Sequence, residues 1–194
     1  MKVDGQNFQS IWLEDDGRKV RVIDQTQLPF QFELKTLTRS ADAVSAISGM
    51  IVRGAPLIGA TAACGLLLAA IENASDDYLS KSAEMLLASR PTAVNLRWAL
   101  ERILPRLLQV APENRFNTAR QEAIKFCNED IATNSRIGDH GLCLLKNLYQ
   151  TKRSEGHLNI LTHCNAGWLA TVDWGTAMAP VFKAHDQGLP VHVW

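Results

Sequence analysis

The chain has 194 residues, enough for one ordinary domain or two small ones. Hydrophobic residues make up 46% of the sequence and charged residues 21%, which excludes a chain that is disordered throughout. Lysine and arginine together number 20, as do aspartate and glutamate, so the formal net charge is zero. Neither half of the chain is markedly basic, and the sequence therefore predicts no nucleic-acid partner.

The apolar segments and the cysteines predict a cytoplasmic protein. The N-terminus lacks the basic start and apolar run of a signal peptide. The most apolar stretch, residues 56–71, is shorter than the about 20 residues that cross a bilayer, so we expect a buried helix and no membrane partner. The 4 cysteines lie far apart with no CxxC spacing, which favours reduced thiols over a zinc site or a disulfide framework.

The first part of the chain predicts a small β structure followed by helices. Residues 11–13 and 19–23 flank the turn signal of residues 15–17 (DDG), which predicts a hairpin. Alternating apolar and polar residues at 30–35 predict a third strand. The apolar period then changes to three and four residues. Helices are expected at 40–49, from 56 onward, and at 76–88, 92–110, 118–133 and 137–149.

The polar segment of residues 151–156 predicts a boundary between a domain of residues 1–150 and a second of residues 157–194. The second domain reads strand, helix, strand, which is the first βαβ unit of a Rossmann-like parallel sheet. The expected fold class is therefore α/β: an N-terminal β-hairpin and helical domain, then an incomplete parallel sheet. Because two parallel strands and one helix cannot bury both sheet faces, we expect the front portion of a longer protein.

Two arginines lie beside predicted helix starts. Arg53 and Gly54 precede a helix N-terminus, where backbone N–H groups and a guanidinium can bind one anion, although the same residues also suit an ordinary turn. Pro91 restricts Arg90 to extended conformations and keeps it out of the preceding helix. Arg90 is thus a candidate phosphate ligand, and a solvated loop arginine is the alternative.

A cysteine lies at the carboxyl end of the first predicted parallel strand, where open α/β sheets bind their ligands. Cys164 precedes the small turn of residues 165–167 (NAG), whose backbone N–H groups can face an exposed thiol. The alternative is a small core residue at a strand end. His163 neighbours Cys164 along the strand and so points to the opposite face. The other histidines have no metal-ligand spacing, and we expect no metal.

Together these segments resemble one enzyme family. Residues 52–59 (VRGAPLIG), 90–96 (RPTAVNL) and 162–167 (THCNAG) match, in order and spacing, the methylthioribose-1-phosphate isomerase family. Residues 24–29 (DQTQLP) are similar to that family's early DQ…LP segment. The similarity covers nearly the whole chain.

The resemblance implies a function in methionine salvage. The family converts 5-methylthioribose 1-phosphate, a cyclic sugar phosphate, into the open ketose 5-methylthioribulose 1-phosphate. By resemblance, Arg53, Gly54 and Ala55 bind this substrate, Arg90 contacts its phosphate and Cys164 is the catalytic cysteine. No metal or organic cofactor is implied, and a homodimer is expected for the full-length family.

The resemblance also leaves alternatives open. The family's second catalytic residue, an aspartate, lies in a later region, and neither Asp173 nor Asp186 matches its motif. An inactive fragment of the isomerase is therefore one alternative. A binding module like the regulatory subunits of translation initiation factor 2B is another, and a ribose 1,5-bisphosphate isomerase is a third. The combination of Arg53, Arg90 and Cys164 favours the methylthioribose-1-phosphate isomerase.

Overall fold

The computed structural model describes residues 1–151 and 156–194. A short hairpin, β1 (Lys2–Val3) and β2 (Gln6–Asn7), opens the chain. An antiparallel sheet follows, in which β4 (Val20–Ile23) lies between β3 (Ile11–Leu13) and β5 (Leu34–Leu37). The predicted hairpin of β3 and β4 is thereby confirmed.

The third strand begins later than the alternation predicted. Phe30 donates its N–H to the Gln27 carbonyl in a turn, and its side chain is 92% exposed. Residues 30–33 are therefore outside the strand, because this turn takes the chain away from β4 before β5 starts at Leu34. The predicted strand of residues 30–35 was therefore wrong for residues 30–33 and right for residues 34 and 35.

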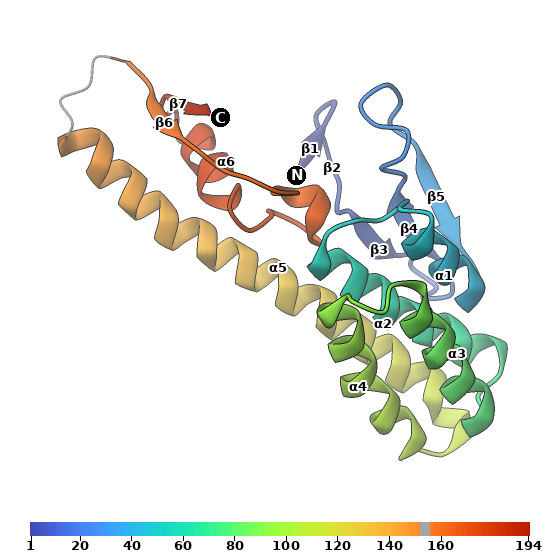
Figure 1. The fold of residues 1–194 in the computed structure, drawn as a ribbon. Coiled ribbons are helices and arrows are strands. Elements are labelled where there is room, and N and C mark those ends of the chain that lie inside the picture. Colours follow the sequence, from blue (N-terminus) through green and yellow to red (C-terminus); the bar gives the residue numbers. More distant parts are fainter. Residues whose placement is uncertain (152–155) are drawn as a thin grey trace.

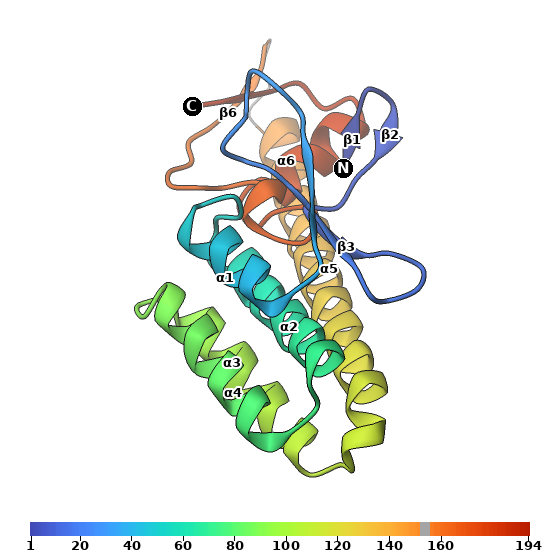
Figure 2. The ribbon, with the colours of Figure 1, turned by 90° about the vertical axis from the view of Figure 1, so that its right-hand side faces the viewer.

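Five helices follow the sheet: α1 (Ser40–Ser48), α2 (Ala55–Glu72), α3 (Asp76–Ser89), α4 (Val94–Leu108) and α5 (Pro112–Thr151). Helix α2 lies at the centre and contacts the other four (Figure 2). Small residues allow this close packing: the position of a Cβ on Gly59 is 3.0 Å from the Asn95 carbonyl oxygen of α4. Among the described residues, α2 alone is long and apolar enough to span a membrane, and 78% of it is buried inside the protein. The predicted buried helix is confirmed.

Helix α5 corrects another prediction, because it is one continuous helix of 40 residues where two were expected. Asn134, near the expected break, donates its side-chain amide to the Asp130 carbonyl one turn earlier and stays in the helix. The first half of α5 packs against α2 and α4, and its second half against α6 (Ala179–Asp186) (Figure 1). Gly138 and Gly141 allow α6 to approach α5 closely, because Lys183 and Pro180 of α6 occupy the space that a side chain at these two positions would need.

The last elements form the predicted strand–helix–strand unit. Strand β6 (Leu158–Ile160) pairs in parallel with β7 (Val191–Val193), and α6 lies between them in the sequence. A short 3-10 helix, η1 (Trp168–Ala170), lies between β6 and α6. The α/β fold class is confirmed. The boundary predicted at residues 151–156 falls largely on 152–155, outside the described residues, so the division into 1–150 and 157–194 remains a prediction.

Candidate functional site

The start of α2 presents backbone donors. Gly54 precedes the helix with φ +97°, a conformation that favours glycine, and Pro56 lies in the first helical turn. The Gly54 carbonyl accepts the N–H of Ile58, the first bond of the helix, at 2.9 Å. Among the described residues, the N–H groups of Gly54, Ala55 and Leu57 have no acceptor, as expected for a first turn. These donors and the positive end of the helix dipole favour an anion.

Both predicted arginines lie in the turns between helices, and their side chains have no partner among the described residues. Arg53 is exposed immediately before α2, and Arg90 is half-buried immediately after α3. Arg90 has φ −151° and ψ 82°, so Pro91 keeps it extended and out of α3, as predicted. In the part of the chain that the structure describes, neither guanidinium has a hydrogen bond or a carboxylate partner. Both are therefore available to a ligand.

Cys164 lies in a strained turn after β6. It is exposed and has φ +77°, which is uncommon for a residue with a side chain. Its carbonyl accepts the N–H of Ala166 at 2.9 Å. Strain of this kind costs roughly 1–3 kcal/mol and clusters at functional sites. The geometry presents the thiol to solvent at the carboxyl end of β6.

Sequence reasoning assigned no role to the neighbouring Asn165. The side-chain nitrogen of Asn165 is buried and has no hydrogen-bond partner among the described residues. A buried donor without a partner is costly, so this nitrogen is an available donor beside Cys164. The only signal in the sequence was its position in the turn of residues 165–167.

The structure places residues of the second predicted segment, and residues that follow the third, beside the first turns of α2. Gly54 lies against Ala170 of η1, so closely that a Cβ at Gly54 would overlap the Ala170 backbone. One turn into α2, Gly59 lies against Asn95 near the start of α4. The start of α2 thus lies between η1 and the start of α4 (Figure 1). Segments far apart in the sequence form one candidate site around this helix end.

The four cysteines fall into two classes. Cys64 of α2 and Cys127 of α5 are buried, whereas Cys143 and Cys164 are exposed, and all are free thiols. A hydrogen bond with Cys127, together with burial, raises the pKa of the Cys64 thiol well above its ordinary value. The thiols of Cys64 and Cys127 are therefore unreactive core groups, as the sequence predicted for some of the four cysteines.

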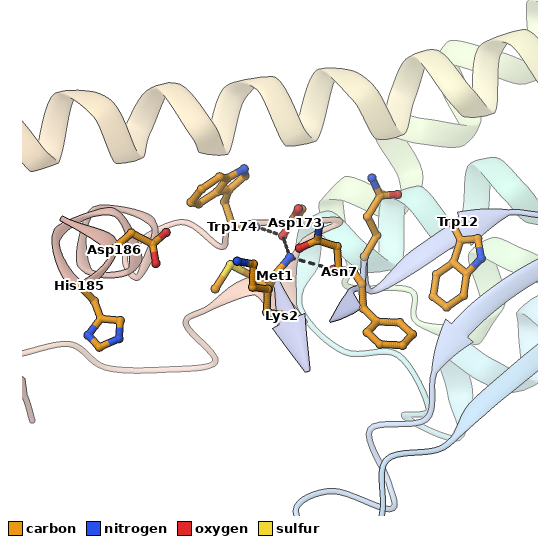
Figure 3. A pocket seen from close by; sticks show the side chains of 10 residues that line it. Met1, Lys2, Asn7, Trp12, Asp173, Trp174, His185 and Asp186 are labelled. Carbon is orange, nitrogen blue, oxygen red and sulfur yellow. Dashed lines mark hydrogen bonds and ion pairs between the residues drawn. The ribbon is translucent and has the colours of Figure 1, made fainter. Parts of the chain in front are cut away.

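A cavity of about 1210 Å³ lies away from this site, between the β1–β2 hairpin and the end of α6 (Figure 3). The N-terminal ammonium group beside it bonds to the Asp173 carboxylate and the Phe8 carbonyl, both at 2.9 Å. Asp173 and Asp186 line this cavity, whereas Arg53, Arg90 and Cys164 do not. Within residues 1–151 and 156–194, no group of three His, Cys, Asp or Glu side chains gathers as a metal site.

Comparison with known proteins agrees with the resemblance inferred from the motifs. The profile of the Initiation factor 2 subunit family matches residues 51–194. Methylthioribose-1-phosphate isomerase of Gluconobacter oxydans is 50% identical over 195 residues, covering 100% of this chain and 53% of that protein. The enzyme of the same name from Rhodospirillum rubrum is 52% identical and is covered over 51% of its length.

Two solved structures share the fold. The 5-methylthioribose 1-phosphate isomerase of Pyrococcus horikoshii OT3 superimposes with a TM-score of 0.82 and 33% identity, over 97% of this chain and 52% of that one. Subunit delta of the translation initiation factor eIF-2B from A. fulgidus gives a TM-score of 0.80 and 36% identity, over 96% of this chain and 54% of that one. The chain spans about half the length of the relatives it matches.

Proposed function

The chain belongs to the initiation factor 2 subunit family, and on that basis we propose that it takes part in the isomerisation of 5-methylthioribose 1-phosphate to 5-methylthioribulose 1-phosphate. Relatives of 46% to 53% identity along the whole chain bear the name of that enzyme and support this assignment. The structural observation that supports it is the close approach of Asn95 to Gly59, and of Ala170, six residues after Cys164, to Gly54 at the start of α2.

The substrate phosphate binds at the start of α2. Arg53 supplies a guanidinium, and the N–H groups of Gly54 and Ala55 supply backbone donors. Arg90 supplies a second guanidinium from the turn between α3 and α4. A phosphate dianion suits this set, because charge-assisted hydrogen bonds to guanidinium groups are about twice as strong as neutral ones. The absence of a carboxylate partner on either arginine, among the described residues, leaves both positive charges for the ligand.

Cys164 acts on the sugar. The isomerisation adds and removes no atoms: the hydrogen on C2 moves to C1, the bond between C1 and the ring oxygen breaks, and the proton of the C2 hydroxyl goes to that oxygen as the C2 carbonyl forms. Phosphate on the anomeric oxygen prevents simple ring opening, so the chemistry needs a group held beside C1 and C2. Cys164 is exposed and lies six residues before Ala170, the residue that contacts Gly54. In the proposed reaction, its side chain assists this hydrogen transfer.

The remaining predictions extend this proposal. The parallel pair β6–β7 with α6 supports a Rossmann-like second domain of residues 157–194 beside the domain of residues 1–150. We also propose a cytoplasmic enzyme that is homodimeric at full length; the names of the relatives support only the sugar-phosphate substrate. No resident cofactor enters the proposed chemistry.

A binding module is the second candidate function. It is favoured by the 36% identical solved structure whose title names a subunit of a translation initiation factor. The relatives of higher identity bear the isomerase name, and the exposed thiol of Cys164 gives a catalytic group that a binding module does not need. These observations favour the isomerase.

The test is an assay of ketose formation from 5-methylthioribose 1-phosphate. Cys164→Ala is compared with Cys143→Ala, which removes the other exposed thiol from α5. Turnover that survives Cys143→Ala and disappears in Cys164→Ala supports the proposed reaction. Binding that depends on Arg53 and Arg90 without turnover favours a chain that holds only the phosphate site. The absence of both binding and turnover would contradict a function for this chain on its own.

A further inference from the structure

Gln25 connects the two halves of the candidate site. Its backbone N–H donates to the Ile51 carbonyl at 3.0 Å, two residues before Arg53. Its side-chain Nε2 donates to the Leu169 carbonyl of η1 at 2.7 Å, five residues after Cys164. A single residue thus holds both the turn that leads into α2 and the segment that follows the cysteine.

The base of this connection is rigid. Gln25 comes directly after β4, in a turn where Thr26 donates its N–H and its hydroxyl to the Asp24 carboxylate at 3.0 and 2.6 Å. Asp24 is 8% exposed, and the N–H of Ile23 donates to the Ser10 carbonyl. Because the turn is fixed to the buried end of the sheet, the Gln25 side chain has a defined origin.

The segment that accepts this hydrogen bond, η1, connects to Cys164 through a closed loop. Leu169 lies in η1, where the Ala170 N–H donates to the Gly167 carbonyl at 3.0 Å. Gly167 in turn lies so close to Gly175 that a Cβ on Gly175 would overlap its backbone, which closes the loop between them. Only Asn165 and Ala166 separate Gly167 from Cys164 in the chain.

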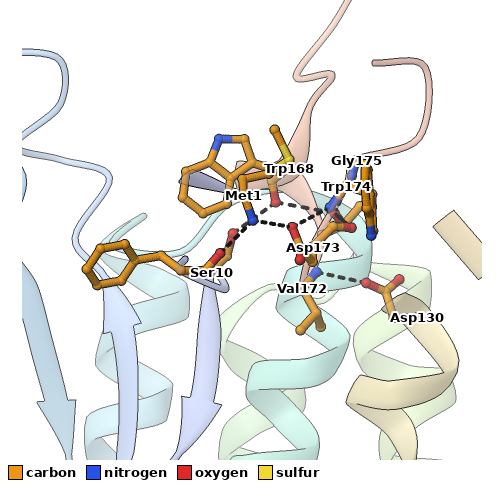
Figure 4. A network of polar contacts seen from close by, with 10 residues as sticks. Met1, Ser10, Asp130, Trp168, Val172, Asp173, Trp174 and Gly175 are labelled. Atoms are coloured by element: carbon orange, nitrogen blue, oxygen red, sulfur yellow. Dashed lines mark hydrogen bonds and ion pairs between the residues drawn. The ribbon is translucent and has the colours of Figure 1, made fainter. Parts of the chain in front are cut away.

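Neighbouring contacts fix other parts of the same loop to the sheet and to α5. The Ser10 hydroxyl donates to the Trp168 carbonyl at 2.9 Å, and the Val172 N–H donates to the Asp130 carboxylate at 2.8 Å (Figure 4). These contacts hold the loop, whereas the two bonds of Gln25 also set its distance from the residues before α2.

We propose that Gln25 is a positioning residue, which sets Cys164 relative to the start of α2 by bridging Ile51 and Leu169. The catalytic consequence rests on the proposed function, since a displacement of about 1 Å at a reacting group can cost about 100-fold in rate. The geometric consequence does not, because it concerns the thiol of Cys164 itself. This role accounts for the DQ…LP segment, to which the proposed chemistry assigns no residue.

The four cysteines provide the test. The rates of alkylation by iodoacetamide are measured for each cysteine peptide in the parent chain and in Gln25→Met, which keeps the side-chain length and removes the donor. We expect the ratio of the Cys164 rate to the Cys143 rate to shift by about threefold or more, as for loss of one hydrogen bond. Cys64 and Cys127 stay protected unless the whole chain unfolds.

Gln27→Met is the matched control, because Gln27 lies two residues later and, among the described residues, its side-chain amide donates only to the neighbouring Thr26 hydroxyl. If Gln25→Met exposes Cys64 and Cys127, Gln25→Asn takes its place, since it keeps the amide and shortens its reach by one methylene. An unchanged rate ratio in a folded Gln25 variant would overturn the proposal, as would an equal shift in Gln27→Met.

Turnover separates this proposal from the proposed function. Where the parent protein forms ketose, Gln25→Met should lower kcat by about tenfold or more with little change in KM, because phosphate binding by Arg53 and Arg90 is kept. A shifted Cys164 rate in a chain without turnover supports the positioning role and contradicts the isomerase. An unchanged Cys164 rate with normal turnover overturns the positioning role alone.

Discussion

Gly54 and Ala170 are in direct backbone contact, although more than half of the chain separates them. Gly54 leads into α2 with φ +97°, and the Cα, carbonyl oxygen and Cβ of Ala170 occupy the space where its side chain would be. The predicted anion site and the segment after Cys164 therefore meet at a position where only glycine fits. The contact explains why a glycine at this helix start matters beyond its backbone freedom.

Gly54→Ala should destabilise the chain by roughly 2–4 kcal/mol and disturb the site, because it combines an unfavourable φ with overlap against backbone atoms. Urea unfolding followed by circular dichroism measures the change. Gly188→Ala is the control, since Gly188 has φ +72° with nothing within 4 Å of an added Cβ. It should cost about 1–2 kcal/mol from the backbone conformation alone. Equal losses in the two variants would contradict the importance of the Ala170 contact.

Arg53→Ala and Arg90→Ala should each weaken the binding of inorganic phosphate or ribose 1-phosphate by about tenfold or more, because each removes a charge-assisted bond. Isothermal titration calorimetry at low salt measures the affinity, which should fall as salt is raised. Arg136→Ala is the control, because Arg136 lies on α5 and its side chain bonds, among the described residues, only to the Thr133 hydroxyl. A similar loss in all three variants would indicate general charge attraction without a defined site.

The sequence contained enough local signal for most element types and for the extended backbone of Arg90. The turn of residues 15–17, the glycine after α1 and Pro56 each mark an element boundary by their own backbone preferences. Arg90 is extended because Pro91 forces it, which is a local effect. Predictions of this kind succeeded because the cause lies within a few residues.

Non-local contacts could not be predicted in the same way. Helix α5 was expected as two helices because the polar residues around Asn134 interrupt the apolar pattern, yet Asn134 bonds within the helix and α6 covers the second half. The sequence also could not predict the hydrogen bond from Gln25, because its acceptor Leu169 is remote in sequence. The positive φ of Cys164 depends on the closed loop that follows it, which no periodicity encodes.

Asp130 and Glu129, neighbours on α5, should give opposite pH dependences of stability. Burial raises the pKa of the Asp130 carboxyl above its ordinary 3.8, outweighing the N–H of Val172 that donates to it. The proton is thus held more tightly in the folded state, so this contribution is present below pH 3.8 and is lost as pH rises through the raised pKa. The unfolding free energy of the parent minus that of Asp130→Asn should therefore fall with rising pH.

Glu129 serves as the matched comparison. The hydrogen bonds from Arg102 lower the pKa of Glu129 below its ordinary 4.5, so its stabilising contribution is present above pH 4.5 and is lost as the pH falls. The parent minus Glu129→Gln difference should rise with pH. Urea unfolding between about pH 3 and 7 measures both differences. Two differences with the same slope would contradict the roles assigned to burial and to Arg102.

Arg115 holds together the ends of three helices. Its guanidinium, 3% exposed at the start of α5, donates to the carbonyls of Ala74 and Val110 at 2.6 and 3.1 Å. It also pairs with Asp76 of α3 at 2.6 Å and donates to the Leu108 carbonyl at the end of α4. These carbonyls lie at or beyond helix ends, and the arginine supplies the donor that each of them lacks.

Arg115→Lys should therefore cost roughly 2–4 kcal/mol of unfolding free energy, because a single ammonium group cannot reach acceptors that the planar guanidinium spans. Urea unfolding again gives the value. Arg106→Lys is the control: within residues 1–151 and 156–194, the half-exposed Arg106 side chain pairs only with Glu122, and such surface pairs contribute about 0–1 kcal/mol. Since Arg115 lies at the opposite end of α2 from Gly54, the rate ratio of Cys164 to Cys143 should stay unchanged in folded Arg115→Lys. A loss no larger than that of Arg106→Lys would show that water satisfies the three carbonyls equally well.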